Sequence, residues 1–242
     1  MTAKDWKYGD AGDRYPVKPG TLWEAGPHLL ACGDLTNRDH YRALLTPAMF
    51  SFIRVPLVYV DPPWTQSLLT GFRTKAKAPA SDQSLEDFTR TLLEPLSTLP
   101  RQPTILMEGS AQPKAMDAVL AAVDTITDLA VRQVWNITYF GDKPGLLYWI
   151  TGHDDPVDPQ SLGFHDMDDA HTPAHAIEAF TEEGNFVLDP CLGRGLTAMT
   201  CQALGRRCIG MELNPRRLAV ALDTLHKKHG LEIKPSGPLT TS

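Results

Sequence analysis

The sequence predicts an α/β fold built on a mostly parallel sheet with an antiparallel hairpin. Short apolar strands alternate with amphipathic helical segments along most of the chain, which favours parallel strands joined by helices. Two strands, Val131 to Phe140 and Leu146 to Thr151, are instead joined by a short turn with Gly and Pro, as in a hairpin. The 242 residues are 42% hydrophobic, which is enough for one domain with its own core.

The ends of the chain differ in composition from its middle. Residues 1–20 mix charged residues with Gly and Pro, and we expect an extended arm there. Residues 231–242 are rich in Pro, Gly, Ser and Thr, which predicts a flexible tail. A single domain is therefore expected over residues 21–230.

The first predicted strand of interest is His28 to Cys32, which follows a Gly-Pro turn and ends on Gly33-Asp34. A helix from Arg38 to Leu45 comes next. Asp34 is thus a carboxylate at a strand end, where ligands bind in open α/β sheets. Asp before a helix is also a common cap, so a capping role for Asp34 is the alternative.

The next strand, Leu57 to Val60, stops abruptly on Asp61-Pro62-Pro63-Trp64. Proline fixes φ and has no N–H for a ladder, so the strand cannot continue past Asp61. The break places a carboxylate, backbone carbonyls and an indole at the carboxyl end of a strand. A planar nitrogen base can stack on Trp64 while its amino group donates to Asp61 and the Pro62 carbonyl. The alternative is a simple turn.

A polar segment from Thr65 to Ser81 is predicted to be a loop, and it carries Arg73, Lys75 and Lys77. These three residues are either a solvated surface or a contact for nucleic-acid phosphates that orders on binding. A capped helix then starts at Ser84-Leu85, and Pro103 to Met107 is predicted to be a strand.

Residues 152–172 form an acidic stretch with six aspartates and three histidines. Their spacing fits no calcium-loop or zinc pattern, so a solvated loop is favoured and no metal is expected. This loop divides the predicted domain into a first half, residues 21–151, and a second half, residues 173–230. Thr172-Pro173 starts a helix, since Pro is favourable at the first helical position.

The second half repeats the pattern of a buried strand that ends on an acid. The strand from Asn185 ends at Asp189, and the Gly193-Arg194-Gly195 turn and an apolar helix follow. Such glycines let the backbone pass close to a ligand, while the helix start offers free N–H groups. The strand from Arg207 ends on Glu212, an acid placed to bind a ribose diol. Glu212 as the cap of the helix from Pro215 is the alternative.

Bulk properties exclude several classes of protein. The net charge of −6 argues against general nucleic-acid adhesion, so phosphate contacts need a local basic patch. The four cysteines lack paired metal spacing and are expected to be reduced thiols. No signal peptide or membrane-spanning run is recognised, and a cytoplasmic protein of a bacterial host or phage-infected cell is expected.

Three segments together resemble the beta-group DNA amino-methyltransferases, which use S-adenosylmethionine. They are Asp61-Pro62-Pro63-Trp64, Asp189-Pro190-Cys191-Leu192-Gly193-Arg194-Gly195-Leu196-Thr197 and Gly210-Met211-Glu212-Leu213-Asn214-Pro215. The segment from Leu22 to Asp34 looks like the opening of many phage and plasmid members. The catalytic strand precedes the cofactor loop, a permuted order that distinguishes this group from most methyltransferases. The resemblance implies a Rossmann-like methyltransferase fold with circularly permuted motifs, its first half catalytic and its second half cofactor-binding.

The resemblance also implies roles for individual residues. The target amine is held by Asp61, Pro62, Pro63 and Trp64. S-adenosylmethionine is bound by Asp34 (adenine amino group), Glu212 (ribose hydroxyls), Thr172, Pro173, Asp189, Pro190, Cys191, Gly193, Gly195 and Thr197. Members with Asp first in the tetrapeptide usually methylate adenine, so the expected product is N6-methyladenine in double-stranded DNA, with the target base flipped out. Arg73, Lys75 and Lys77 are the expected DNA contacts.

The sequence departs from the family pattern at several positions. Cys191 replaces the usual Phe, Arg194 and Leu196 replace Ser and Thr, and Thr172 replaces Lys. Two alternative functions remain open. One is an RNA adenine methyltransferase, since the Asp-Pro-Pro-Trp spelling also occurs in that group; the other is a degenerate subunit that binds DNA or a partner while another chain catalyses. Little of the chain is left for target recognition, so we expect either a short recognition sequence or dependence on a second copy or partner protein.

Overall fold

The computed structural model describes residues 10–49, 53–139, 142–153 and 157–240. Among these residues, ten strands form one sheet in the order β10-β1-β2-β9-β8-β3-β4-β6-β5-β7. Its five central strands run parallel, so their carboxyl ends lie at one edge of the sheet. These strands are β2 (His28–Cys32), β9 (Arg207–Glu212), β8 (Phe186–Asp189), β3 (Leu57–Val60) and β4 (Thr104–Ser110).

Antiparallel strands close both sides of this parallel centre. On one side β1 (Thr21–Ala25) pairs with β2 and with β10 (Ile233–Pro238). On the other side β5 (Ala130–Tyr139) and β6 (Lys143–Thr151) form a hairpin, and the short β7 (Met167–Asp168) adds to β5. The predicted fold class, mostly parallel with an antiparallel hairpin, is confirmed; Phe140, at the end of one predicted strand, lies outside the described residues.

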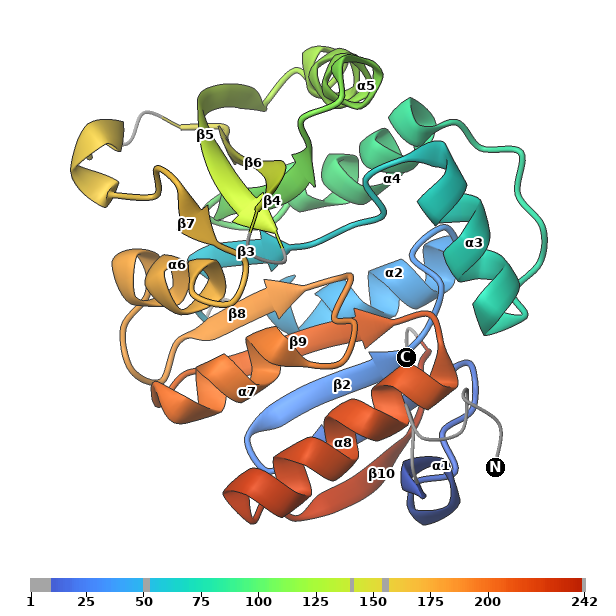
Figure 1. Ribbon diagram of the computed structural model, residues 1–242. Coiled ribbons are helices and arrows are strands. Elements are labelled where there is room, and N and C mark those ends of the chain that lie inside the picture. The colour runs from blue at the N-terminus through green and yellow to red at the C-terminus, as the bar shows by residue number, and fades with distance from the viewer. Residues whose placement is uncertain (1–9, 50–52, 140–141, 154–156, 241–242) are drawn as a thin grey trace.

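Helices cover both faces of the sheet, which gives three layers (Figure 1). Each face packs its own hydrophobic cluster against the helices above it, because the central strands are apolar on both sides. One face carries α2 (Arg38–Leu45), the 3₁₀ turn Thr46–Met49, α4 (Leu85–Ser97) and α5 (Pro113–Asp124). The other carries α1 (Ala11–Arg14), α6 (Thr172–Phe180), α7 (Leu196–Ala203) and α8 (Pro215–His229).

The segment predicted to be a polar loop between Thr65 and Ser81 is mainly a helix, α3 (Gln66–Ala76). Thr65 caps it by accepting a hydrogen bond from the Leu68 N–H, and Lys77 ends it in the left-handed conformation. The loop prediction was wrong because the apolar residues of α3 follow no simple helical stripe. Figure 1 shows α3 beyond the arrowheads of β2 and β9, at the carboxyl edge of the sheet.

Both ends of the described chain are more ordered than expected. Residues 233–238 of the predicted flexible tail form β10, because their backbone pairs with β1, and Leu239 is buried. In the predicted extended arm, α1 packs on α8, and Arg14 forms a 2.6 Å ion pair with Asp223. Residues 1–9 of that arm lie outside the described residues. The acidic loop contains a 3₁₀ turn, Pro159–Leu162, and β7.

Candidate active site

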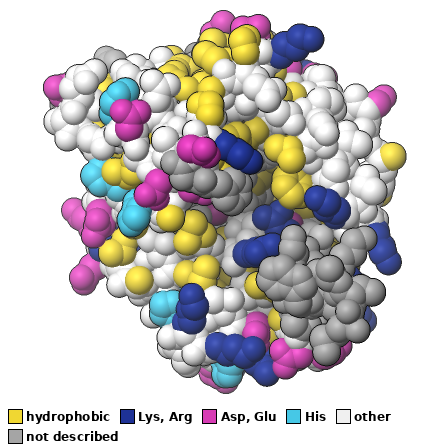
Figure 2. Space-filling model, in the orientation of Figure 1, with side chains coloured by type: hydrophobic (Ala, Val, Ile, Leu, Met, Phe, Trp, Pro, Cys, Tyr) yellow, Lys and Arg dark blue, Asp and Glu magenta, His cyan; other side chains and the backbone are white. Residues whose placement is uncertain are grey.

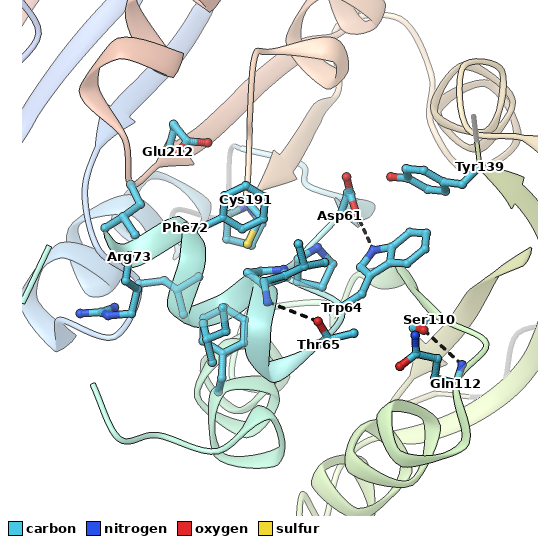
Figure 3. A pocket seen from close by; sticks show the side chains of 18 of the residues that line it. Asp61, Trp64, Thr65, Phe72, Arg73, Ser110, Gln112, Tyr139, Cys191 and Glu212 are labelled. Atoms are coloured by element: carbon cyan, nitrogen blue, oxygen red, sulfur yellow. Dashed lines mark hydrogen bonds between the residues drawn. The ribbon is translucent and has the colours of Figure 1, made fainter. Parts of the chain in front are cut away.

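A cavity of about 830 Å³ opens at the carboxyl edge of the parallel strands (Figure 3). Its size is within the usual range for small-molecule sites. The loops after β2, β3, β8 and β9 all contribute to its wall, together with α3 and the β4–α5 connection. Predicted site residues in the wall are Asp34, Asp61, Pro62, Pro63, Trp64, Arg73, Pro190, Cys191 and Glu212.

The tetrapeptide after β3 is held by its own side chains and by the hairpin beside it. The Trp64 indole N–H donates to Asp61 Oδ1 at 2.7 Å, and the Trp64 ring meets the Tyr139 ring edge-on, with centroids 4.2 Å apart. Gly145 on β6 makes room for the indole, since a Cβ there would lie 3.0 Å from Trp64. Figure 3 shows the Tyr139 hydroxyl facing Asp61.

Asp61 faces the cavity solvent, with protein on its other sides. Burial of the carboxyl raises its pKa, while hydrogen bonds from Tyr139 and Trp64 and the positive charge of Arg217 act in the opposite direction. The carboxylate therefore has fixed partners on one side and an open side toward the cavity. Such a group can accept a hydrogen bond from a polar ligand that enters.

Glu212 is the last residue of β9, and its side chain is hydrogen-bonded to the glycine turn after β8. Its carboxylate accepts hydrogen bonds from the backbone N–H groups of Gly193, Leu213 and Asn214, the last at 2.7 Å, and lies 3.7 Å from the Arg217 guanidinium. Burial nevertheless raises the pKa of Glu212. Asn214, rather than Glu212, caps α8, so the alternative capping role of Glu212 is wrong.

Asp34 also lines the cavity, and Arg73 of α3 binds it. The Arg73 guanidinium donates to Oδ1 at 3.1 Å and to Oδ2 at 2.9 Å, and Thr36 donates twice more to Oδ1. These contacts lower the pKa of Asp34 although burial opposes them. Oδ2 keeps capacity for a further donor. Asn37 caps α2, so Asp34 does not serve as its cap.

The prediction of Arg73 as a DNA contact is wrong, because its side chain is 9% exposed and bound to Asp34. Lys75 and Lys77 are exposed at the end of the same helix. Figure 2 shows basic side chains around the hollow in the middle of this face, with acidic and histidine side chains toward its left. A role of Lys75 and Lys77 in binding nucleic acid stays a prediction.

Six further predicted cofactor residues do not line the cavity. Asp189 is buried, accepts a 2.9 Å bond from the Cys191 N–H and another from Thr197, and burial raises its pKa to about 7. Gly195 has a φ of +85°, and a Cβ there would lie 2.7 Å from Ala221 of α8. The Thr172 hydroxyl donates to a backbone carbonyl. The six are Thr172, Pro173, Asp189, Gly193, Gly195 and Thr197.

Sequence reasoning missed four residues of the site: Phe72, Glu108, Tyr139 and Arg217. The Arg217 guanidinium lies over the Phe72 ring at 5.1 Å and beside Glu212. Glu108 extends β4 beyond the predicted strand and repeats the pattern of an apolar strand followed by an acid. That pattern was the signal that could have identified it.

The described residues contain no group of three or more potential metal ligands. None of the described helices combines the length and apolar character that crossing a membrane requires.

Comparison with known proteins finds a family match within the second half of the chain. Residues 170–223 match the DNA methylase family of N6/N4 type. The chain resembles the DNA methylases over this segment. The type II methyltransferase M.XycI of Xanthomonas campestris pv. cyanopsidis is 40% identical to the chain over 58 residues. That match covers 24% of the chain and 19% of the relative's length.

Solved DNA methyltransferases share the fold over most of the chain. The M1.HpyAVI–SAM complex superimposes with a TM-score of 0.55 at 13% identity, covering 77% of this chain and 96% of that one. PvuII DNA methyltransferase, which is cytosine-N4-specific, gives 0.50 at 13% identity and covers 71% and 80%. At this identity the likeness establishes the fold, and the predicted Rossmann-like methyltransferase fold is confirmed.

Proposed function

We propose that this protein transfers the methyl group of S-adenosylmethionine to the exocyclic amine of a base in DNA, with N6 of adenine as the target. The observation that supports this most strongly is that one cavity is lined both by Asp61–Trp64 and by Asp34 and Glu212. The residues expected to hold the amine therefore face the residues expected to hold the cofactor. The DNA methylase match of residues 170–223 supports the same activity.

The donors and acceptors of the cavity fit the adenosine part of S-adenosylmethionine. Asp34 keeps an acceptor site on Oδ2 for an adenine amino group, and the Glu212 carboxylate borders the cavity for ribose hydroxyls. Cys191, in place of a larger ring, adds a small apolar surface to the wall. When bound, S-adenosylmethionine supplies an electrophilic methyl group.

Asp61 and the backbone around it prepare the amine for that methyl group. An aromatic amine is a poor nucleophile because its lone pair is delocalised into the ring. Hydrogen bonds from the amine to Asp61 and the Pro62 carbonyl favour the pyramidal form, whose lone pair is free. The protein then acts by orientation and electrostatics, without a covalent bond to the base. Trp64 and Tyr139 offer aromatic surface beside Asp61 for a base that has left the duplex.

Adenine is proposed as the target because the tetrapeptide begins with Asp, as it usually does in the adenine enzymes that this chain resembles. Cytosine N4 is the competing target, since PvuII DNA methyltransferase has the same fold and acts there. Both reactions use an exocyclic amine, so the same Asp61 chemistry serves either base. The identity of the methylated nucleoside decides between them.

The test is transfer from methyl-labelled cofactor to duplex DNA and, in parallel, to RNA. We expect label in DNA, recovered as N6-methyladenine after digestion to nucleosides. Label only in RNA would support an RNA adenine methyltransferase, and label in N4-methylcytosine would correct the base. A chain that binds DNA but transfers no label would be a degenerate subunit, and the proposed activity would be refuted.

Target choice is proposed to depend on a short recognition sequence or on a second copy or partner protein. The described residues between Trp64 and Thr172 are mostly used in α3 to α5 and β4 to β7, which leaves few side chains for reading base edges. Methylation mapping with the purified protein tests this. A long recognition sequence methylated by a monomer would contradict it.

A further inference from the structure

A second carboxyl group lies beside Asp61, inside the sheet. Glu108 is on β4, and the register that pairs Val60 with Met107 places Glu108 next to Asp61. Its side chain is 2% exposed, in a strand whose seven residues are all buried. Burying a carboxyl group in an apolar strand is costly unless it is neutralised or hydrogen-bonded. The position of Glu108 therefore requires a functional explanation.

Two tyrosines connect Glu108 to the proposed active site. The Tyr59 hydroxyl donates to Glu108 Oε1, and the Tyr139 hydroxyl is hydrogen-bonded to both Asp61 and Glu108. Glu108 Oε2 is buried without a hydrogen-bond partner among the described residues. Both tyrosine hydroxyls therefore meet Oε1, and a protonated Oε1 can donate to the Tyr139 oxygen while it accepts from Tyr59, whereas a carboxylate accepts only.

The surrounding charges decide which of the two carboxyl groups is ionised. Burial, with the neighbouring charges of Asp61 and Asp169, raises the pKa of Glu108 well above its usual range. Burial raises the pKa of Asp61 as well, but Arg217 of α8 acts to lower it, and Asp61 is open to the cavity. Two adjacent carboxyl groups do not both ionise readily, so the charge belongs on Asp61 and the proton on Glu108.

We propose that Glu108 is a neutral positioning residue: it donates its proton toward the Tyr139 oxygen, and the Tyr139 hydroxyl donates in turn to Asp61. This direction of donors makes Asp61 the last acceptor of the series Glu108, Tyr139, Asp61 and leaves its remaining lone pairs for the target amine. The inference rests on the proposed methyl transfer. It adds that Tyr59 and Tyr139 orient a protonated acid behind the carboxylate that meets the substrate.

The first test compares two variants. Glu108→Gln resembles the neutral acid in shape and keeps an N–H donor, whereas Glu108→Ala removes both the side chain's shape and its donor. We expect methyl transfer at neutral pH to fall by no more than about 3-fold in Glu108→Gln. In Glu108→Ala we expect a loss of about 10- to 100-fold, from a misplaced Asp61. Equal losses in both variants would overturn the inference. Glu94→Gln, at an exposed site on α4, is the matched control.

The pH profile separates this role from simple packing. Deprotonation of Glu108 at high pH would turn it into a hydrogen-bond acceptor, so Tyr139 would donate to Glu108 instead of Asp61. Methyl transfer by the wild type should therefore fall as the pH rises, and Glu108→Gln should not show this fall. The groups that face Glu108 are Tyr59 on β3, Asp61 after β3, Tyr139 on β5 and Asp169 after β7. Identical profiles for wild type and Glu108→Gln would contradict the proposal.

An infrared difference spectrum shows whether Glu108 is protonated, independently of methyl-transfer activity. Subtracting the spectrum of Glu108→Gln from that of the wild type at neutral pH should leave the carbonyl band of a protonated, buried carboxylic acid. The spectrum of Glu94→Gln, subtracted in the same way, is the control for changes that do not come from Glu108. Absence of the protonated band overturns the inference even in an active enzyme. Its presence in a chain without transfer activity supports the inference while the proposed function fails.

Discussion

The buried imidazole of His28 makes a measurable prediction about how stability depends on pH. His28 on β2 is fully buried; Nδ1 accepts a 3.0 Å bond from the Cys208 N–H, which places the proton on Nε2, 3.0 Å from Gln202 Oε1. Burial lowers its pKa from an ordinary value of 6.5 to about 4. The folded protein thus holds a neutral histidine that the unfolded chain would protonate.

The direction and size of the change in stability with pH follow from this difference in the pKa of His28 between the folded protein and the unfolded chain. Because the unfolded chain binds the proton below pH 6.5 and the folded protein does so only near pH 4, stability falls as the pH drops through this window. The full difference of 2.5 pH units corresponds to about 3 kcal/mol, of which about 2 kcal/mol is lost between pH 7 and pH 5. Asp189 acts in the opposite direction, since its raised pKa adds stability as the pH falls below about 7.

The assay is urea unfolding at several pH values for wild type and His28→Asn. The asparagine oxygen can still accept the Cys208 N–H, and all other titrating groups are shared, so the difference between the two proteins isolates His28. We expect the free energy of unfolding of the wild type to fall by about 2 kcal/mol more than that of the variant between pH 7 and pH 5. Parallel curves would refute the reasoning. His165→Asn removes an exposed imidazole and is the control.

Two further predictions concern ligand binding. Glu212→Gln should weaken S-adenosylmethionine binding by about 10- to 100-fold, because the ribose loses a charged acceptor; unchanged affinity by calorimetry would show that Glu212 only ties the glycine turn to β9. Replacing Lys75 and Lys77 together with Ala should weaken DNA binding across sequences and reduce its salt dependence by about one to two counterions without changing the methylated base. A salt titration of binding with an unaltered slope would remove these lysines from the interface.

Much of the fold was predictable because strand ends carry local signals. Asp61 is followed by two prolines and Asp189 by a glycine turn, so the strands and their carboxyl edge were placed correctly. β10 was missed because Pro235, Gly237 and Pro238 read as a flexible tail. Its pairing with β1 is a contact across the whole chain, which local patterns do not contain.

A site residue could be predicted where it lies in a recognisable sequence motif. It could not be predicted where its role depends on a residue that the fold brings next to it. Arg73 looked like a free cation in a basic segment, but α3 brings it to Asp34, 39 residues away. Glu108 looked like the end of a strand, and only the register with β3 sets it beside Asp61. Charged residues act according to their neighbours, and those neighbours come from tertiary packing.

The central claim is that Asp61 holds a base amine for methylation, and it can be tested in DNA from cells that express this chain. Nucleosides from such DNA are analysed by mass spectrometry for wild type and for Asp61→Ala, with S-adenosylmethionine binding of both purified proteins measured alongside. We predict N6-methyladenine from the wild type, a loss of at least about 100-fold in the variant, and nearly equal cofactor binding. Unchanged methylation by Asp61→Ala would contradict the assignment of this carboxylate and of the site built around it.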